Sequence, residues 1–214
     1  MVEGKQLYDA IVNGNAKLAR AATETALAAG AAPMDLIQEV MVPAMEEVGR
    51  LFEAEEYFVP ELLLSGRAMK SAMELIKPLL SAAGQRMKIR VVIGTVKGDL
   101  HDIGKNIVAS MLEGGGFEVI DLGTDVSPES FVAAVKDRSP QVVCMSALLT
   151  VTMPAMKLTI DALKTAGVRT QVKVLVGGAP VTHQYAKEIG ADGYSENANG
   201  AVGLVKNLTA GEAA

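Results

Sequence analysis

The stretch IRVVIGTVKGDLHDIGKN, residues 89–106, decides the fold that the sequence predicts. It begins with a run of β-branched residues, typical of a buried strand, and passes through a glycine-containing loop into residues with helical spacing. The same alternation recurs along the chain, with further strands expected at 117–121, 141–146, 172–176 and 193–194. Near-continuous apolar strands separated by helices indicate a parallel sheet that is covered on both faces. We therefore predict an α/β domain over residues 85–214, with a five-stranded, doubly wound, Rossmann-like sheet.

Residues 1–84 have a different pattern, in which glycine is sparse and helix formers dominate. Residues 15–29 are rich in alanine and predict one helix. Apolar residues recur every four positions over residues 35–51, which predicts an amphipathic helix, and a further helix is expected over about residues 60–80. These segments indicate an N-terminal four-helix bundle ahead of the sheet domain.

The composition argues against several classes of protein. A formal charge of -5 over 214 residues does not suit a nucleic-acid-binding face, which needs to be basic. No apolar run approaches the roughly 18 residues of a membrane span, and the first residues lack the features of a signal peptide. The single cysteine, Cys144, cannot form an internal disulfide and lies in a predicted strand, where we expect it to be buried. We therefore expect a cytoplasmic protein whose partners include neither nucleic acid nor a membrane.

Polar residues and glycines follow three of the predicted strands, at the point where each strand ends. They are Asp99, His101 and Asp102 after the first strand, Ser146 and Thr150 after the third, and Gly177 and Gly178 after the fourth. In open parallel sheets, ligands bind at the carboxyl ends of the strands, near the point where the strand order reverses. Taken singly, each residue also has an ordinary explanation. The aspartates and hydroxyls could cap helices, a loop histidine is commonly a surface residue, and paired glycines are frequent in turns.

The combination of these residues is more specific than its parts. Asp99-x-His101-x-x-Gly104, Ser146-x-Leu148 and Gly177-Gly178 resemble, in order and spacing, the signature of cobalamin-binding domains of the methionine synthase type. The run LFEAEEYFVP, residues 51–60, is similar to the turn of the helical cap domain in the same family. The whole chain resembles the stand-alone corrinoid proteins of anaerobic methyltransferase systems, which serve methanol, methylamines, betaines or methoxylated aromatics.

The resemblance implies that the protein is a methyl carrier with a cobalamin cofactor, and not a complete enzyme. Such a carrier accepts a methyl group on Co(I) from a substrate-specific methyltransferase. It delivers the group from methyl-Co(III) to a second methyltransferase, which passes it to a thiol or to tetrahydrofolate. A reductive activator of the corrinoid is a further implied partner. The alternative is a cobalamin-dependent sensor or regulator with the same two domains, which the acidic balance and the lack of tryptophan disfavour. A third possibility is the small subunit of an adenosylcobalamin mutase. Such subunits usually lack the helical cap, so the predicted N-terminal bundle disfavours this possibility.

The resemblance also implies a role for each residue of the signature. His101 would be the lower ligand of cobalt, and Asp99 and Thr152 would form a hydrogen-bond relay behind it. The family has serine at the position of Thr152, so this member of the relay departs from the pattern. The other cofactor-binding positions implied in this domain are Gly98, Asp102, Ile103, Gly104, Ser146, Leu148, Thr150, Gly177 and Gly178, of which Ser146, Thr150 and the paired glycines would serve the nucleotide tail.

The N-terminal helices would form a cap over the upper face of the cofactor. The resemblance aligns Phe52 and Val59 with two apolar residues that cover the reactive face. Their spacing of seven equally suits the core of an ordinary bundle, so both explanations stay open. A cap of residues 1–84 would have to open and close on the domain of residues 85–214, and we expect the hinge at residues 81–85.

Overall fold

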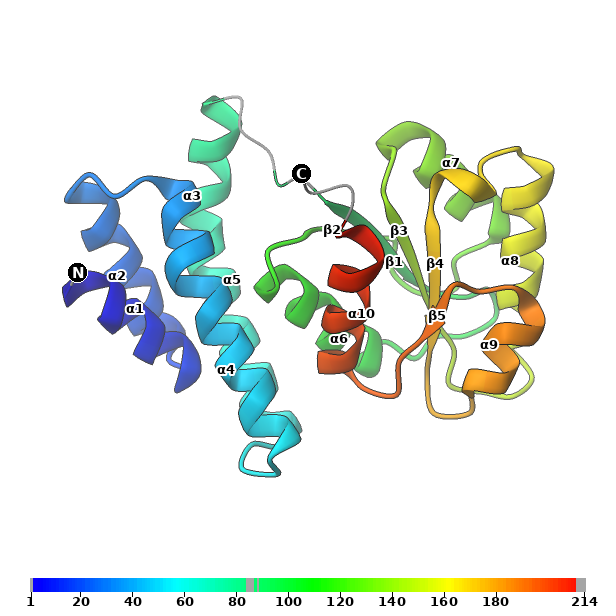
Figure 1. The fold of residues 1–214 in the computed structure, drawn as a ribbon, viewed down its shortest axis with the longest axis horizontal. Helices are drawn as coiled ribbons and strands as arrows, with labels where there is room; N and C mark the ends of the chain where they lie inside the picture. The colour runs from blue at the N-terminus through cyan, green and yellow to red at the C-terminus, as the bar shows by residue number, and fades with distance from the viewer. Residues whose placement is uncertain (1, 84–86, 88, 211–214) are drawn as a thin grey trace. The chain divides into compact units, whose positions relative to one another are not determined.

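The computed structural model describes residues 2–83, 87 and 89–210, and the chain divides into two compact units. The helical unit comprises Met1–Met87 with Ser110–Gly116, and the sheet unit comprises Lys88–Ala109 with Phe117–Ala214. An N-terminal helical bundle followed by a doubly wound parallel sheet is the predicted fold class, and the structure confirms it (Figure 1). The predicted domain boundary between residues 84 and 85 lies outside the described residues and stays a prediction.

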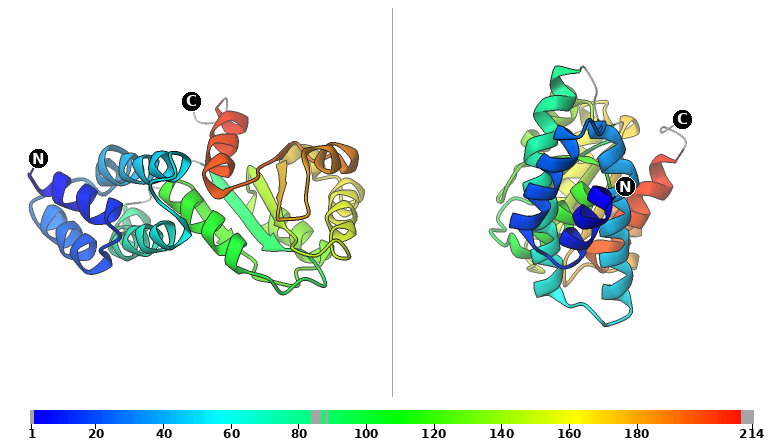
Figure 2. Two further views of the ribbon diagram at one scale, coloured as in Figure 1. Left: turned by 90° about the horizontal axis from the view of Figure 1, so that it is seen from below. Right: turned by 90° about the vertical axis from the view of Figure 1, so that its left-hand side faces the viewer.

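The helical unit is an antiparallel arrangement of four long segments. They are α1 (Val2–Val12), α2 (Ala16–Ala28), the run of α3 (Pro33–Asp35), η1 (Leu36–Met41) and α4 (Val42–Glu53), and α5 (Val59–Ala82). Both α2 and α4 pack against α1 and α5 (Figure 2). Aliphatic and methionine side chains such as Leu7, Ile11, Met69 and Met73 fill the interior, because the chain has few aromatic residues. Residues 81 and 82 of the predicted hinge belong to α5, whereas residues 84 and 85 lie outside the described part of the chain.

The helix predicted over residues 35–51 departs from α-helical geometry in its first part. Leu36–Met41 is a π-helix, in which the N–H of Val42 donates to the carbonyl of Ile37, five residues earlier. Pro43 follows directly, and proline has no N–H to continue the regular pattern of hydrogen bonds. A π turn is one of the ways in which a helix accommodates such a break. Hydrophobic periodicity therefore located this helix but could not specify its hydrogen bonding.

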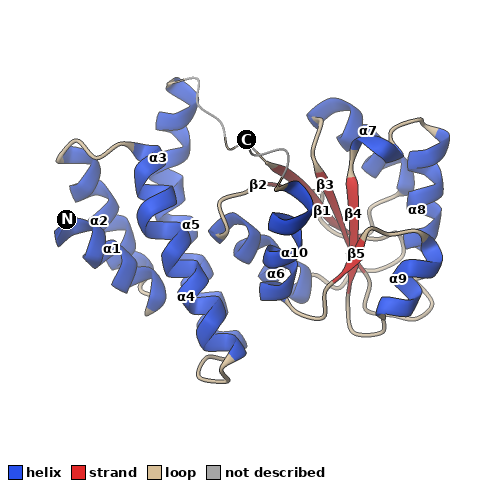
Figure 3. Ribbon diagram, in the orientation of Figure 1, coloured by secondary structure: helices blue, strands red, loops and turns tan. Residues whose placement is uncertain are grey.

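The sheet unit contains five parallel strands in the order β2-β1-β3-β4-β5 (Figure 3). The strands are β1 (Arg90–Thr95), β2 (Glu118–Asp121), β3 (Val142–Ser146), β4 (Lys173–Gly177) and β5 (Gly193–Tyr194). One face is covered by α6 (Ile103–Gly114) and α10 (Ala198–Thr209), and the other by α7 (Pro128–Arg138), α8 (Pro154–Thr165) and α9 (His183–Ile189) (Figure 1). A short 3-10 helix, η2 (Arg169–Gln171), precedes β4. Buried valines of the three central strands pack with Phe131 and Ile160 to form the core of the second face.

Cys144 lies in the middle of β3, where it is buried as the sequence predicts. Burial raises the pKa of the Cys144 thiol to about 12. Since the thiolate is the form that attacks disulfide reagents, we expect no reaction of the native protein with Ellman's reagent. Reaction should appear in urea, as the sheet unit unfolds. Because Cys144 is the only cysteine of the sequence, the labelling rate would report on this unit alone. Labelling of the native protein at the rate of a free thiol would contradict the prediction.

Candidate functional site

The three strand ends singled out in the sequence lie side by side in the sheet. Thr95, the last residue of β1, is in register with Ser146 at the end of β3, and Ser146 is in register with Gly177 at the end of β4. The chain leaves β1 for β2 on one side and places β3 on the other, so the strand order reverses between β1 and β3. The loops after these two strands carry the residues that the sequence analysis selected.

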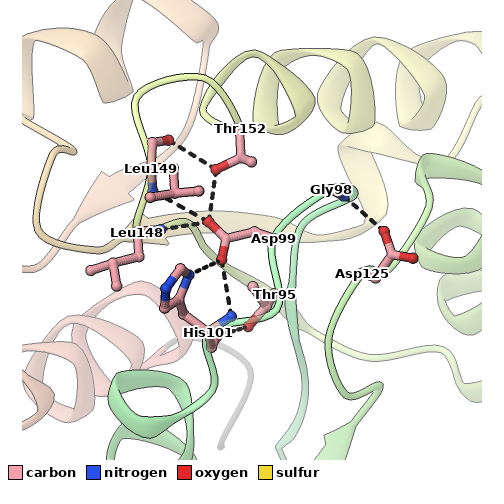
Figure 4. Close-up of polar contacts among 8 residues, drawn as sticks. All are labelled: Thr95, Gly98, Asp99, His101, Asp125, Leu148, Leu149 and Thr152. Carbon is pink, nitrogen blue, oxygen red and sulfur yellow. Dashed lines mark hydrogen bonds and ion pairs between the residues drawn. The ribbon is translucent and has the colours of Figure 1, made fainter.

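Asp99 is the centre of the polar contacts at this edge, and its side chain is fully buried (Figure 4). Oδ1 accepts a hydrogen bond from the N–H of His101 at 3.0 Å and lies 2.7 Å from His101 Nδ1. Oδ2 accepts hydrogen bonds from the N–H groups of Leu148 at 2.8 Å and Leu149 at 3.3 Å. Thr152 Oγ1 lies 2.7 Å from the same oxygen. One carboxylate therefore links the loop after β1 to the loop after β3.

These contacts determine the charge of Asp99. Burial raises the pKa of Asp99, because it disfavours the charged form. The hydrogen bonds from Thr152, from the N–H groups of His101 and Leu148 and from the imidazole lower it. The net result is a pKa well below the ordinary value of 3.8. Asp99 is therefore a carboxylate at neutral pH, and its side chain accepts every hydrogen bond that it makes.

His101 is held by its main chain and by its ring. Its carbonyl accepts a hydrogen bond from Thr95 Oγ1 at 2.9 Å, and its N–H donates to Asp99. Because Nδ1 faces a carboxylate, which only accepts hydrogen bonds, Nδ1 carries the ring proton and Nε2 is the basic nitrogen. The side chain is 50% exposed, so the imidazole is oriented from one side and accessible from another. This is the arrangement of a histidine that binds a metal through Nε2.

Thr95 is a residue of the site that the sequence analysis missed. Its side chain is fully buried, and its hydroxyl reaches the carbonyl of His101, six positions later. The only signal in the sequence was its place as the first polar residue after the run of apolar strand residues. A threonine at a strand end is too common to be selected on that basis.

Asp99 and Asp102 could each have capped the following helix, and the structure shows that they have different partners. The carbonyl of Asp102 accepts the N–H of Asn106 at 2.8 Å, and its carboxylate accepts the Asn106 amide at 3.1 Å. Asp102 therefore lies at the first turn of α6 and interacts with that helix. The side-chain bonds of Asp99 described above go instead to His101 and to the loop after β3.

The glycines of the signature differ in what their missing side chains would meet. A Cβ on Gly104, in the first turn of α6, would have nothing within 4 Å, whereas a Cβ on Gly177 would lie 3.2 Å from the carbonyl oxygen of Ser195. At Gly178 the backbone has φ of +127°, and a Cβ would lie 1.9 Å from the carbonyl oxygen of Ala147. The packing of the chain itself thus requires glycine at 178, while the space at 104 is open.

Large apolar side chains are exposed in the two loops that Asp99 links, one of which carries His101. Leu100 and Ile103 from the loop after β1 are 74% and 72% exposed, and Val151 from the loop after β3 is 80% exposed. Leu148 and Leu149 are also exposed, and Figure 4 shows Leu148 beside the imidazole. Leucine, isoleucine and valine gathered around an oriented polar group are typical of a binding site for a largely apolar ligand.

The remaining predicted residues have fewer contacts or lie in the other unit. Thr150 is exposed, and Ser146 is half-buried at the end of β3. Phe52 is half-buried near the end of α4, and Val59 is exposed as the first residue of α5. Phe58, which the sequence analysis did not single out, is more exposed than Val59, at 61% against 42%.

Comparison with known proteins identifies the ligand of the family. Residues 89–203 match a family described as "B12 binding domain", and residues 4–77 match a second family of the same description. The "Trimethylamine corrinoid protein 2" of Methanosarcina mazei is 48% identical over 200 residues, which cover 92% of each chain. The chain belongs to the B12-binding corrinoid proteins. Both the predicted family and cobalamin as the cofactor are confirmed.

Solved structures support the same assignment for this corrinoid protein. A cobalamin-binding protein from Desulfitobacterium hafniense DCB-2 is 34% identical, with a TM-score of 0.77, and the match covers 96% of this chain and 98% of that one. The crystal structure of the methanol:cobalamin methyltransferase complex MtaBC from Methanosarcina barkeri matches with a TM-score of 0.88 at 33% identity. That match covers 98% of this chain and 80% of the other.

The residues present fit a corrinoid. Among the described residues, no group of three or more His, Cys, Asp or Glu side chains could hold a metal ion by itself. A single oriented imidazole instead suits a metal whose other ligands come from a macrocycle, and the exposed apolar side chains around it suit the faces of that macrocycle. Within the described ranges, no helix is both long and apolar enough to span a membrane.

Proposed function

We propose that this corrinoid protein is a methyl carrier and that Nε2 of His101 is the lower ligand of its cobalt. The observation that supports the proposal is the contact between Nδ1 of His101 and the buried Asp99 carboxylate, which leaves Nε2 as the basic nitrogen. Bound cobalamin would supply a cobalt centre that accepts and releases a methyl group. The protein's contribution would be to hold that centre and to tune the basicity of the imidazole.

The relay behind the imidazole would have a defined task. Asp99 holds the proton of His101 on Nδ1, and a hydrogen bond to a carboxylate makes Nε2 a stronger donor to a metal. Thr152 Oγ1 lies between Asp99 Oδ2 and the carbonyl of Leu149, at 2.7 Å and 2.8 Å, so its one hydrogen is shared between two acceptors. A threonine hydroxyl can therefore serve as the third member of the relay, where the family pattern has serine.

We assign the other residues of the signature to the cofactor as the resemblance implies. Gly98, Asp102, Ile103 and Leu148 would line the lower face around the imidazole. The open space at Gly104 would allow close approach of the cofactor. Ser146, Thr150, Gly177 and Gly178 would hold the nucleotide tail at the edge of β3 and β4, where their register brings the strand ends together.

The partners follow from the carrier function. We infer a methyltransferase that donates the methyl group, a second methyltransferase that passes it to a thiol or to tetrahydrofolate, and a reductive activator, all in the cytoplasm. A methylamine is the proposed methyl source, because relatives named trimethylamine corrinoid proteins are 48% identical to this chain. The covering role of Phe52 and Val59, and a hinge at residues 81–85 between domains of residues 1–84 and 85–214, stay predictions.

The alternative, a cobalamin-dependent sensor or regulator, is less well supported. The relatives reported above are corrinoid, cobalamin-binding and methyltransferase proteins. The carrier and the sensor differ in one measurable property, since only the carrier exchanges a methyl group with partner enzymes.

Replacing His101 by alanine should separate ligation from binding of the cofactor. We expect the His101→Ala protein to load with cobalamin, because the nucleotide tail still has its site, but to show a changed visible spectrum. The reduced wild-type protein should gain a methyl group from trimethylamine in the presence of its methyltransferase, and methylation of the variant should be at least about tenfold slower. Absorption spectra and labelled trimethylamine measure the two effects.

The controls distinguish the parts of the proposal. His183→Ala changes the other histidine, which lies at the start of α9, and should behave as the wild type. A wild-type spectrum in the His101→Ala protein would refute the ligand assignment. Methylation from methanol or dimethylamine but not from trimethylamine would refute the proposed methyl source, and no methyl acceptance with any partner would refute the carrier function.

A further inference from the structure

Asp125 is an exposed aspartate outside the cobalamin signature that contacts the loop carrying His101. It follows β2, next to Val126, which forms a parallel bridge with Val96. Its backbone has φ of +55°, a left-handed conformation that few residues other than glycine adopt. Asparagine and aspartate tolerate this conformation best, because their short polar side chains make local hydrogen bonds. The position therefore favours a residue that tolerates positive φ and whose side chain can form a hydrogen bond.

Asp125 makes two hydrogen bonds to main-chain groups of adjacent residues in the loop after β1, one with its side chain and one with its own N–H. Its Oδ1 accepts the N–H of Gly98 at 2.8 Å, as Figure 4 shows, and its own N–H donates to the carbonyl of Asp99 at 2.9 Å. Gly98 itself has φ of +84°, so the loop turns sharply at this point. The two bonds hold the peptide before Gly98 and the peptide after Asp99, and so fix the backbone on both sides of the Gly98–Asp99 pair.

The side chain of Asp125 also forms an ion pair with Lys97. This ion pair and the hydrogen bond from the Gly98 N–H differ in how much they contribute to the structure. Lys97 Nζ lies 3.0 Å from Oδ2, with the lysine and aspartate side chains 57% and 42% exposed. Exposed ion pairs of this kind contribute little to stability. The pKa of Asp125 lies below its ordinary value, first because of the Gly98 N–H and then because of Lys97. The main-chain contact is thus the one with structural consequences.

We propose that Asp125 is a positioning residue for cobalt ligation, which acts by fixing the backbone on both sides of the Gly98–Asp99 pair and so the orientation of the Asp99 carboxylate toward His101. The proposal rests on the assignment of His101 as the ligand. Asp99 can hold the imidazole only while its own backbone is held. The loop after β2 supplies part of that support through Asp125, beside the hydrogen bond from the Asp99 N–H to the carbonyl of Val96 at 3.1 Å. The ligand then depends on three strand ends of the sheet, those of β1, β2 and β3.

Four variants isolate the Gly98 hydrogen bond. Asp125→Gly removes the acceptor but keeps a residue that adopts positive φ, so it avoids the strain that alanine would introduce. Asp125→Asn keeps an acceptor oxygen and removes the charge. Lys97→Met removes the ion pair only. Asp161→Ala is the matched control, because Asp161 is 43% exposed and pairs with Lys157 on α8, away from the loop.

The first measurement needs no cofactor. The protein has two histidines, so ¹⁵N-histidine labelling gives one imidazole of interest and His183 as an internal reference. In the Asp125→Gly protein we expect hydrogen exchange at the Gly98 amide to be faster by about tenfold or more. We also expect the His101 ring nitrogens to lose the pure Nδ1–H pattern, with His183 unchanged. The Asp125→Asn, Lys97→Met and Asp161→Ala proteins should match the wild type within about twofold.

The second measurement uses the same labelled proteins loaded with cobalamin and reduced to Co(II). Coupling of the unpaired electron to ¹⁵N in the EPR spectrum reports ligation by the protein's histidine. We expect the ratio of coupled to uncoupled cobalt to fall by about tenfold in the Asp125→Gly protein. Recovery by asparagine is expected, because its amide oxygen can accept the Gly98 N–H.

The outcomes separate the two proposals. No coupling in the wild type would refute His101 as the ligand, while the cofactor-free comparison would still decide the role of Asp125. Wild-type exchange and tautomer in the Asp125→Gly protein would overturn the positioning role. Equal defects in the Asp125→Asn and Asp125→Gly proteins, or a defect of the same size in Lys97→Met, would assign the effect to charge and overturn the role of the Gly98 hydrogen bond.

Discussion

Replacing Asp99 by asparagine is expected to lower the free energy of unfolding of the sheet unit by about 3 kcal/mol. Both oxygens of Asp99 accept, and three of their donors are the main-chain N–H groups of His101, Leu148 and Leu149. Asparagine has one acceptor oxygen and one donor amide, so one set of donors at this buried carboxylate would face another donor. The loss can be measured from the urea dependence of Cys144 labelling, because that thiol reports on β3.

Asp102→Asn is the control for this variant, since Asp102 lies in the same loop but is exposed. We expect it to change the free energy of unfolding by less than about 0.5 kcal/mol. If the two substitutions lowered the free energy of unfolding equally, the hydrogen bonds of Asp99 would contribute no more to stability than those of an exposed aspartate in the same loop.

The effect of Asp99 should also depend on pH in a defined direction. Its folded pKa lies below the ordinary value of 3.8, so the folded carboxylate binds a proton less readily than the unfolded one. Its contribution to stability is therefore complete above that value and is lost as the pH falls through it toward the folded pKa. The difference between the wild type and Asp99→Asn should be largest at neutral pH and should narrow in acid. A difference that stays constant in acid would contradict the hydrogen-bonding account.

The second large effect is expected at Gly178, where alanine should destabilise the sheet unit by about 4 kcal/mol. The new Cβ would lie 1.9 Å from the carbonyl oxygen of Ala147 and 2.9 Å from its carbonyl carbon. Both atoms belong to the buried backbone that follows β3, which has no free side chain to rotate away. The φ of +127° adds strain for any residue with a side chain. Cys144 labelling in urea measures the loss.

Gly104→Ala is the matched substitution at the open glycine. Its Cβ would meet nothing within 4 Å, and alanine favours the helix, so the variant should gain roughly 0.5 kcal/mol of stability. If cobalamin approaches Gly104 closely, the same variant should load the cofactor more weakly. A Gly178→Ala protein as stable as Gly104→Ala would show that the loop after β3 shifts freely.

The fold could be predicted because the signals for strands and helices lie within short stretches of the sequence. Runs rich in β-branched residues located β1, β2, β3 and β4 to within one or two residues, and the residues that follow β1, β3 and β4 identified the edge of the sheet that carries the site. The signature then brought Asp99, His101 and Thr152 into one hypothesis, and the structure places their polar atoms within hydrogen-bonding distance.

The contacts that depend on register and loop conformation could not be predicted. Thr95 and Asp125 support the His101 loop from a strand end and from another loop, and neither residue type is unusual at its position. The reason for glycine at 178 lies in the backbone of Ala147, which is distant in the sequence. Helical periodicity likewise gave no sign of the π turn at Leu36–Met41, since that turn follows from where Pro43 stands in the hydrogen-bond ladder.

The Asp99–Thr152 hydrogen bond joins residues 53 positions apart, and this separation has a consequence for biosynthesis. A chain that has emerged from the ribosome only as far as α6 contains His101 but lacks the loop that shares its carboxylate partner. Non-local contacts of this kind form late in folding, because the entropy of closing the intervening segment must be overcome first. Tight capture of the corrinoid by the imidazole would then become available only after the parallel sheet has assembled, so cofactor loading would act as a check on correct folding.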